Sequence, residues 1–153
     1  MITIELPDEA ATAALAARLA ALARAGDVIA LKGELGAGKT SFARAFIRAR
    51  GGTEDVPSPT FTLVQVYEIG ETCVWHFDGY RLRDPAEAWE LGIEDAFQDG
   101  ISLIEWPDQF GTLLPQRRLH IALLPGAAPT ARRAVLDAGP EWKARLCRIA
   151  AAL

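Results

Sequence analysis

The chain has 153 residues and a formal net charge of −4, and half of its residues are hydrophobic. This length and balance predict a single domain, residues 1–153, with a sizeable hydrophobic core, and the acidic excess argues against a large surface for nucleic-acid phosphates. The two cysteines match no metal-ligand spacing and favour a reducing compartment. Charge interrupts the apolar stretches, so neither a signal peptide nor a membrane span is predicted, and a cytoplasmic location is expected.

The first half of the chain alternates between strands and helices. Its expected elements are a strand at 3–6, a helix at 8–24, a strand at 28–33, a helix at 39–50 and a loop at 53–61. The helices follow from apolar residues that recur at helical spacing, with Asp8 as an N-cap for the first of them. The strand at 28–33 is a continuous apolar run, which indicates a buried strand.

The second half mixes hairpins with further helices. We expect paired strands at 62–69 and 72–78, a helix at 84–98 interrupted by Gly92, a strand at 101–106, a short helical piece at 107–114, paired strands at 118–126 and 132–139, and a helix at 140–153. Because strand–helix units occur beside hairpins, we predict a mixed sheet that lies between helices.

The segment GELGAGKT, residues 33–40, fits the phosphate-binding pattern G-x-x-x-x-G-K-[S/T] and lies between a predicted strand and a predicted helix. Glycines let such a loop curl so that its N–H groups point inward, and the helix adds the positive end of its dipole. Lys39 is expected to reach the β- and γ-phosphates, and the Thr40 hydroxyl suits Mg²⁺. The candidate nucleotide-binding residues here are Glu34, Leu35, Gly36, Ala37, Gly38, Lys39, Thr40 and Ser41. The alternative is a flexible turn, but a chance match is expected in well under roughly 1% of chains of this length.

The expected fold class is therefore α/β: a P-loop NTPase-like three-layer sandwich with a mixed, partly parallel central sheet. Nucleotide hydrolysis also needs an acidic residue near the metal and a group that orients the attacking water. Asp78 and Glu105 end two predicted strands, where ligands bind in open α/β sheets. We expect Asp78 to serve Mg²⁺ and Glu105 to position water, so these two and Lys39 are the candidate catalytic residues. Thr40, Asp78 and Glu105 are the candidate metal ligands, although either carboxylate could instead be a solvated strand end or a helix cap.

Other polar and aromatic residues allow two interpretations each. Thr60, on the loop before the first hairpin, suits a switch that senses γ-phosphate and Mg²⁺, but a simple turn former explains it nearly as well. Trp106 is a candidate to stack on a base, and core packing is equally plausible. His76 alternates with aromatic residues on a strand and is expected to be packed rather than to act as a base. Arg81 and Arg83 could clamp phosphate or a partner, and exposed arginines are the simpler explanation.

Four segments in order, GELGAGKT, SPTFTLV, HFDGYRL and IEWPD, resemble the TsaE (YjeE) family of small bacterial P-loop ATPases. The resemblance runs from the first predicted helix to at least Asp108. It implies Mg²⁺–ATP binding, weak ATPase activity, and association with TsaB and TsaD, which place the threonylcarbamoyl group on adenosine in tRNA. Contact with tRNA would then be indirect, and ATP binding and hydrolysis would support multiple turnover by resetting the partner complex.

The same resemblance extends to single residues. It gives phosphate and Mg²⁺ roles to Lys39, Thr40 and Asp78, a switch-like role to Thr60, and a place beside the nucleotide to Glu105 and Trp106. Gly79 departs from the family pattern, which usually has a larger apolar residue there, and a looser backbone beside Asp78 is expected from it.

Two alternatives to an ATPase stay open. A small-molecule kinase would use the same loop, but it needs an acceptor pocket and arginines that close over the transferred phosphate. A nucleotide-dependent binding module with incidental hydrolysis needs neither of them. A GTPase is less favoured, because the sequence contains no N/T-K-x-D segment for guanine recognition.

Overall fold

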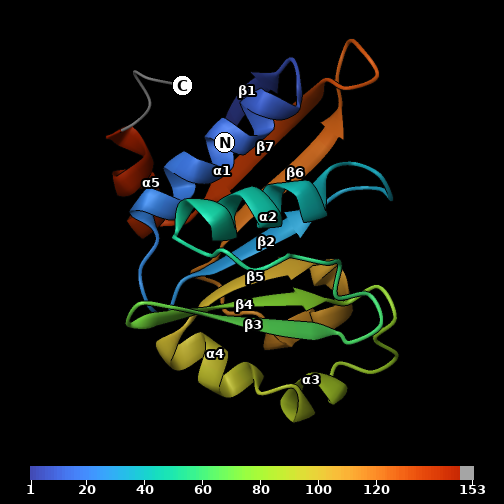
Figure 1. The fold of residues 1–153 in the computed structure, drawn as a ribbon, viewed down its shortest axis with the longest axis vertical. Helices are drawn as coiled ribbons and strands as arrows, with labels where there is room; N and C mark the ends of the chain where they lie inside the picture. Colours follow the sequence, from blue (N-terminus) through green and yellow to red (C-terminus); the bar gives the residue numbers. More distant parts are fainter. Residues whose placement is uncertain (149–153) are drawn as a thin grey trace.

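The computed structural model describes residues 1–148, and these form one mixed sheet with helices on both of its faces (Figure 1). The strands are β1 (Ile2–Leu6), β2 (Val28–Lys32), β3 (Val64–Ile69), β4 (Thr72–Asp78), β5 (Ile101–Glu105), β6 (Leu119–Pro125) and β7 (Arg132–Ala138). The helices are α1 (Glu9–Leu22), α2 (Lys39–Ala49), α3 (Glu87–Glu90), α4 (Ile93–Asp99), the 3-10 helix η1 (Pro107–Leu113) and α5 (Pro140–Cys147). Each predicted strand is present, with ends within two residues of the expected ones.

The strand order in the sheet is β1-β7-β6-β2-β5-β4-β3. The central strand β2 runs parallel to both β5 and β6, and β4 runs parallel to β5, whereas the outer pairs are antiparallel. In this register Glu105 lies opposite Leu31 on one side and opposite Asp78 on the other. The carboxyl ends of β2, β4 and β5 therefore meet at one edge, and the predicted α/β class with a mixed, partly parallel sheet is confirmed.

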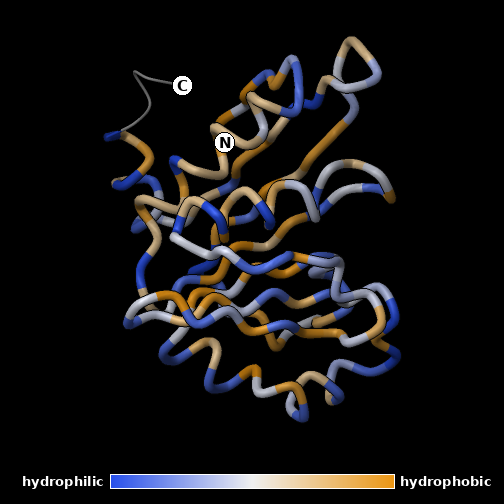
Figure 2. The backbone as a smooth tube through the Cα atoms, in the orientation of Figure 1, coloured by the Kyte–Doolittle hydropathy of each residue, from blue (hydrophilic) through white to orange (hydrophobic). Residues whose placement is uncertain are grey.

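Two hydrophobic cores cover the two faces of the sheet. The larger core joins α1, α2 and α5 to the face that carries Leu31 and Leu103, and the smaller core joins α3, α4 and η1 to the face that carries Val28 and Ile104. Figure 2 shows hydrophobic colouring along the central strands. This arrangement is a three-layer sandwich, as predicted. Among residues 1–148, no helix combines the length and the apolar character that crossing a membrane requires.

The predicted helix at 84–98 begins later than expected. The Asp84 carboxylate accepts from the N–H of Ala86, and the Asp84 carbonyl accepts from the N–H of Glu87, so a turn takes the place of the first helical residues. Gly92, with φ of +85°, then separates α3 from α4, as the sequence predicted. At the other end of the chain α5 is described to Cys147, and the part of the predicted last helix beyond 148, including Ile149, lies outside the described residues.

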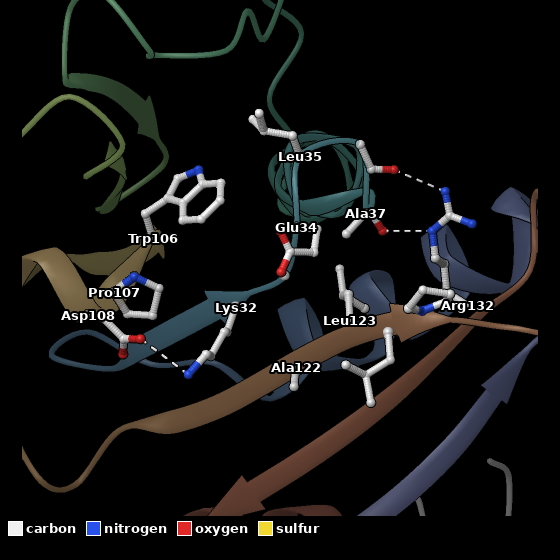
Figure 3. A pocket seen from close by; sticks show the side chains of 14 residues that line it. Lys32, Glu34, Leu35, Ala37, Trp106, Pro107, Asp108, Ala122, Leu123 and Arg132 are labelled. Carbon is white, nitrogen blue, oxygen red and sulfur yellow. Dashed lines mark hydrogen bonds and ion pairs between the residues drawn. The ribbon is translucent and has the colours of Figure 1, made fainter.

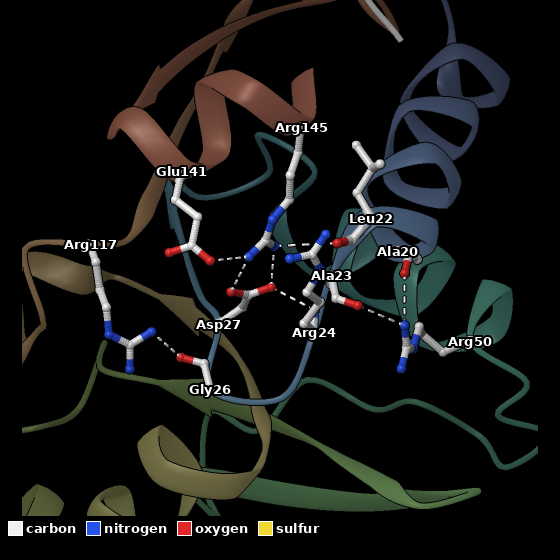
Figure 4. Close-up of polar contacts among 10 residues, drawn as sticks. All are labelled: Ala20, Leu22, Ala23, Arg24, Gly26, Asp27, Arg50, Arg117, Glu141 and Arg145. Carbon is white, nitrogen blue, oxygen red and sulfur yellow. Dashed lines mark hydrogen bonds and ion pairs between the residues drawn. The ribbon is translucent and has the colours of Figure 1, made fainter. Parts of the chain in front are cut away.

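A buried ion pair fastens α5 to the start of β2 (Figure 4). Arg145 donates to both carboxylate oxygens of Asp27, at 2.5 and 3.2 Å, and it also donates to Glu141 at 2.6 Å. The backbone N–H of Arg24 donates to the same Asp27 carboxylate at 2.6 Å. Burial alone would lower the pKa of Arg145, but the hydrogen bond and charge of Asp27, followed by those of Glu141, raise it. The cluster therefore links the last helix to the start of the central strand through a buried ion pair.

Candidate functional site

The loop that joins β2 to α2 has the backbone that the phosphate-binding motif predicts. Gly36 and Gly38 adopt left-handed conformations, with φ of +80° and +100°, which side chains with a Cβ rarely adopt. Gly33 packs closely, because a Cβ there would lie 2.9 Å from the carbonyl oxygen of Leu123. The helix α2 follows Gly38 directly, so the N–H groups of its first turn lack intrahelical partners and are available to an anion.

Lys39 is buried at the start of α2, with its ammonium folded onto the loop. Its Nζ donates to the carbonyl oxygens of Gly33 and Glu34, the second at 3.0 Å, and lies 4.0 Å from the centre of the Trp106 ring. Burial lowers the pKa of Lys39, and the nearby charges of Glu105, Asp78 and Glu34 partly offset that effect. The ammonium thus contacts neutral carbonyls and a ring while acidic groups lie close by.

Glu105, at the end of β5, is buried and contacts two polar side chains. The Thr40 hydroxyl lies 3.1 Å from each of its carboxylate oxygens, and His76 Nε2 lies 2.6 Å from Oε2. The sequence predicted a packed histidine, and His76 is fully buried, but its contact with Glu105 was not foreseen. The available signal was the spacing HFD: strand alternation places His76 on the same face as Asp78, which lies opposite Glu105.

Asp78 is buried at the end of β4 and holds the preceding loop. Its Oδ2 accepts from the Thr60 hydroxyl at 3.0 Å, and its Oδ1 accepts from the backbone N–H of Tyr80 at 2.9 Å. The hydroxyls of Ser58 and Thr60 are 2.7 Å apart. The loop that was expected at 53–61 is therefore attached to the site through Thr60, the residue proposed as a switch.

The backbone after Glu105 is tightly packed and strained. Trp106 has a φ of +56°, in the left-handed region, and its ring lies 5.1 Å from that of Tyr80. Gly79 donates its N–H to the Glu105 carbonyl at 2.9 Å, and a Cβ at Gly79 would lie 2.7 Å from the Trp106 carbonyl. The expectation of a looser backbone beside Asp78 is thus replaced by a close approach of two segments that only glycine allows here.

These groups meet in a cavity of about 270 Å³, which we call the P-loop cavity. Its lining residues are the segment 35–41 with Ser58, Thr60, Asp78, Tyr80, Glu105 and Trp106. Every candidate site residue of the sequence lines it except Glu34, which lines the neighbouring cavity. The structure therefore brings together residues from the loop, from α2, from the 53–61 segment and from the ends of β4 and β5.

A second cavity of about 380 Å³ adjoins the first across Trp106 and the loop (Figure 3). We call it the apolar cavity, because Leu123, Pro107 and Trp106 supply much of its wall. Arg132, at the start of β7, borders it and donates to the carbonyls of Ala37 at 2.9 Å and Gly36 at 3.0 Å. Sequence reasoning missed this cavity and Arg132, since the β6–β7 hairpin that supplies them carries no motif.

The donor set of the P-loop cavity suits a hard cation that keeps several outside ligands. Thr40, Asp78 and Glu105 offer hydroxyl and carboxylate oxygens, the ligand type that Mg²⁺ prefers. Among residues 1–148, no cluster of three or more His, Cys, Asp or Glu side chains could hold a metal ion by itself. The residues therefore fit Mg²⁺ bound together with phosphate oxygens and water.

Taken together, the sheet and the loop define a P-loop NTPase-like α/β protein. The family model for "Threonylcarbamoyl adenosine biosynthesis protein TsaE" matches residues 6–134. The chain therefore belongs to the TsaE family, whose role lies in the biosynthesis of threonylcarbamoyladenosine in tRNA.

Individual relatives agree with this assignment. The tRNA threonylcarbamoyladenosine biosynthesis protein TsaE of Bacillus subtilis is 42% identical over 118 residues, which cover 76% of this chain and 72% of that protein. The protein of the same name from Rickettsia felis is 39% identical over 119 residues, covering 77% and 70%. The crystal structure of Bacillus subtilis YdiB superposes with a TM-score of 0.82 at 30% identity, covering 99% of this chain and 95% of that one.

Proposed function

We propose that the protein binds Mg²⁺–ATP in the P-loop cavity and hydrolyses it slowly. The observation that carries this proposal is the convergence of Lys39, Thr40, Asp78 and Glu105 on one cavity at the carboxyl edge of the sheet. The loop amides and the start of α2 would cradle the phosphates. Lys39 would exchange its contacts with two loop carbonyls for phosphate oxygens, a stronger interaction because both partners are charged.

The carboxylates have separate tasks in this proposal. Thr40 and Asp78 would hold Mg²⁺, which when bound supplies positive charge that offsets the charge of the phosphates. Glu105 would accept a hydrogen bond from the attacking water and orient it toward the γ-phosphate. The Thr60 hydroxyl donates to Asp78 at 3.0 Å, so the position of its loop would respond to phosphate and Mg²⁺ bound in the cavity.

The apolar cavity would receive the base of the nucleotide. It adjoins the loop and shares Leu35, Gly36, Ala37 and Trp106 with the P-loop cavity, so one ligand can extend across both. A flat, largely apolar ring suits walls made of Leu123, Pro107 and the Trp106 ring. Adenine specificity itself rests on membership of the family.

The physiological role that we propose is support of the TsaB–TsaD complex in the cytoplasm, with tRNA contacted indirectly through these partners. The acidic net charge of −4 favours this arrangement over direct binding of tRNA. Cys73 and Cys147, both unpaired in the part of the chain that the structure describes, are in keeping with a reducing compartment.

The decisive experiment measures phosphate release by the purified protein with Mg²⁺–ATP, with and without TsaB and TsaD. We expect slow release alone and sustained tRNA modification over many turnovers with the partners. Glu105→Ala and Asp78→Asn should bind ATP but fail to sustain modification. A protein that never releases phosphate under either condition would refute the ATPase.

The same samples test the two alternatives. A phosphorylated acceptor in place of free phosphate would indicate a kinase, although no arginine is found among the described residues that line the P-loop cavity. Full tRNA modification with Glu105→Ala and Asp78→Asn would favour the binding module with incidental hydrolysis. The contact between Thr60 and Asp78 would suit such a module, because it couples a loop to the occupancy of the cavity.

A further inference from the structure

His76 occupies a place on β4 where packing alone would favour an apolar side chain. It is fully buried on the face of the sheet that packs against α2, and Val74, two residues earlier on the same face, is an ordinary core residue. The Nδ1 atom of His76 is buried without a hydrogen-bond partner among residues 1–148. A buried polar atom left unpaired is costly, so the imidazole is expected to serve a purpose that an aliphatic side chain cannot.

The other ring nitrogen of His76 contacts Glu105. Nε2 lies 2.6 Å from Oε2 of Glu105, a short contact between two almost completely buried groups. We assign the donor role to this nitrogen, because a carboxylate accepts hydrogen bonds through both of its oxygens. With Nε2 as the donor, Nδ1 is an acceptor that has no partner among residues 1–148.

The two oxygens of Glu105 are thereby made unequal. Thr40 contacts both at 3.1 Å, but His76 contacts Oε2 alone. Within residues 1–148, Oε1 has Thr40 as its hydrogen-bond partner, so it is the oxygen with capacity left for a further donor. A glutamate has three side-chain torsions, so its carboxylate needs a fixed partner to keep a single orientation.

We propose that His76 is a positioning residue, which holds Oε2 of Glu105 so that Oε1 is presented to the attacking water. The inference rests on the proposed ATPase and adds a residue to it. His76 lies behind Glu105 and does not line the P-loop cavity, so its loss should slow hydrolysis and leave the binding of nucleotide intact.

Two amide substitutions of different reach test this. His76→Gln can place its amide N–H near the position of Nε2, whereas the shorter amide of His76→Asn ends near the position of Nδ1 and cannot contact Glu105. We expect His76→Gln to keep at least half of kcat and His76→Asn to lose about tenfold, with the KM for ATP and the Kd for a fluorescent ATP analogue changed less than twofold in both. His120→Gln, at the other histidine of the chain, is the control and should match the wild type.

A double-mutant cycle shows whether the effect passes through Glu105. In a Glu105→Ala background, His76→Asn should slow phosphate release by less than twofold, because the group that it positions is already gone. Equal tenfold losses in both backgrounds would mean a general structural effect and would overturn the proposal. So would an unchanged kcat in His76→Asn, or a folded His76→Gln that is as slow as His76→Asn.

The contact itself has a readout that does not depend on hydrolysis. The imidazole ¹⁵N spectrum of the whole protein should contain two histidines, with the His120 signals identified by their loss in His120→Gln. We expect the other ring to be protonated at Nε2 and to change its ¹⁵N shifts in Glu105→Ala, while the signals of His120 stay in place. A His76 ring protonated at Nδ1 would overturn the proposal. A wild-type protein without phosphate release would refute the proposed ATPase as well, whereas failure of the His76 variants in an active protein refutes only this inference.

Discussion

Buried charged groups lie at both ends of strand β2, and at the amino end two of them form an ion pair with each other. At the amino end, Asp27 and Arg145 form a bidentate pair whose side chains are 7% and 4% exposed. At the carboxyl end, Lys39 contacts neutral carbonyls and a ring, while Asp78 and Glu105 lie in the wall of the same cavity. In the first cluster opposite charges pair with each other, whereas the charged groups of the second retain capacity for a charged ligand. Buried charge therefore holds the fold at one end and is available for binding at the other.

Backbone strain is also found at the carboxyl end. In the part of the chain that the structure describes, Leu63 and Trp106 are the non-glycine residues with positive φ. Leu63 accepts from the backbone N–H of Asp78 at 3.0 Å, and Trp106 directly follows Glu105. Leu63 thus contacts the backbone of Asp78, and Trp106 adjoins Glu105, so both strained residues lie next to acidic residues that line the P-loop cavity.

The largest effect is expected on the stability of the fold, when the buried ion pair at the amino end of β2 is broken. Arg145→Ala would leave Asp27 buried without its charged partner, which typically costs about 3–5 kcal/mol of unfolding free energy. Chemical denaturation measures that loss. Glu141→Ala removes the exposed partner of the same arginine and should cost less than about 1 kcal/mol. Equal losses in the two variants would contradict the distinction between a buried and an exposed contact.

At the carboxyl end, the corresponding substitution should affect binding more than folding. Lys39→Ala removes the proposed charged donor to phosphate, worth about 1.5–3 kcal/mol, so ATP affinity should fall roughly 10- to 150-fold. The unfolding free energy should change little, because the buried ammonium has no charged partner at hydrogen-bond distance among the described residues. Lys143→Ala, on α5, is the matched control. A titration with a fluorescent ATP analogue checks both, and near-native affinity in folded Lys39→Ala would contradict the assigned contact.

A smaller effect is expected from the arginine that holds the loop from β7. Arg132→Met keeps the aliphatic stem but removes the hydrogen bonds to the Gly36 and Ala37 carbonyls, so the loop should lose part of its preorganisation. We expect a loss of about 1 kcal/mol in ATP binding, roughly fivefold in Kd. Its neighbour Arg133 pairs with Glu5 on β1, so Arg133→Met is the control and should bind ATP as the wild type does. Calorimetric titration with ATP measures the Kd of both variants, and equal Kd values would contradict the role given to Arg132.

The smallest effect is on the pH dependence of stability, and it concerns His120, which lies beside the middle of β2. Burial, together with the charge of Arg118, lowers the pKa of His120 from its usual 6.5, although Asp137 acts in the opposite direction. The unfolded chain therefore binds the proton more readily, so this residue contributes stability above pH 6.5 that is lost as the pH falls through the lower folded pKa. His120→Gln should flatten the decline of unfolding free energy below pH 6.5. A steeper decline in the variant would show that the sign is wrong.

The sequence predicted the parts of the molecule that depend on local pattern. The loop at 33–40 was visible because its glycines, lysine and threonine have fixed spacing, and Asp78 and Glu105 were visible because each ends a predicted strand. Arg132 and Leu123 could not be found in this way, since their place beside the loop depends on β6 pairing with β2. For the contact between His76 and Glu105, the HFD spacing indicates that His76 and Asp78 share a face, but the place of Glu105 beside them depends on the register of β4 against β5.

The pairing of the first strand with the last one has a consequence for synthesis on the ribosome. β1 spans Ile2–Leu6, and its partner β7 spans Arg132–Ala138, so nearly the whole chain must emerge before the two can meet. The start of β7 also carries the arginine that braces the phosphate loop. A nascent chain that ends before this strand contains the loop residues but lacks the arginine that contacts them, so we expect the proposed affinity for nucleotide to develop late in translation.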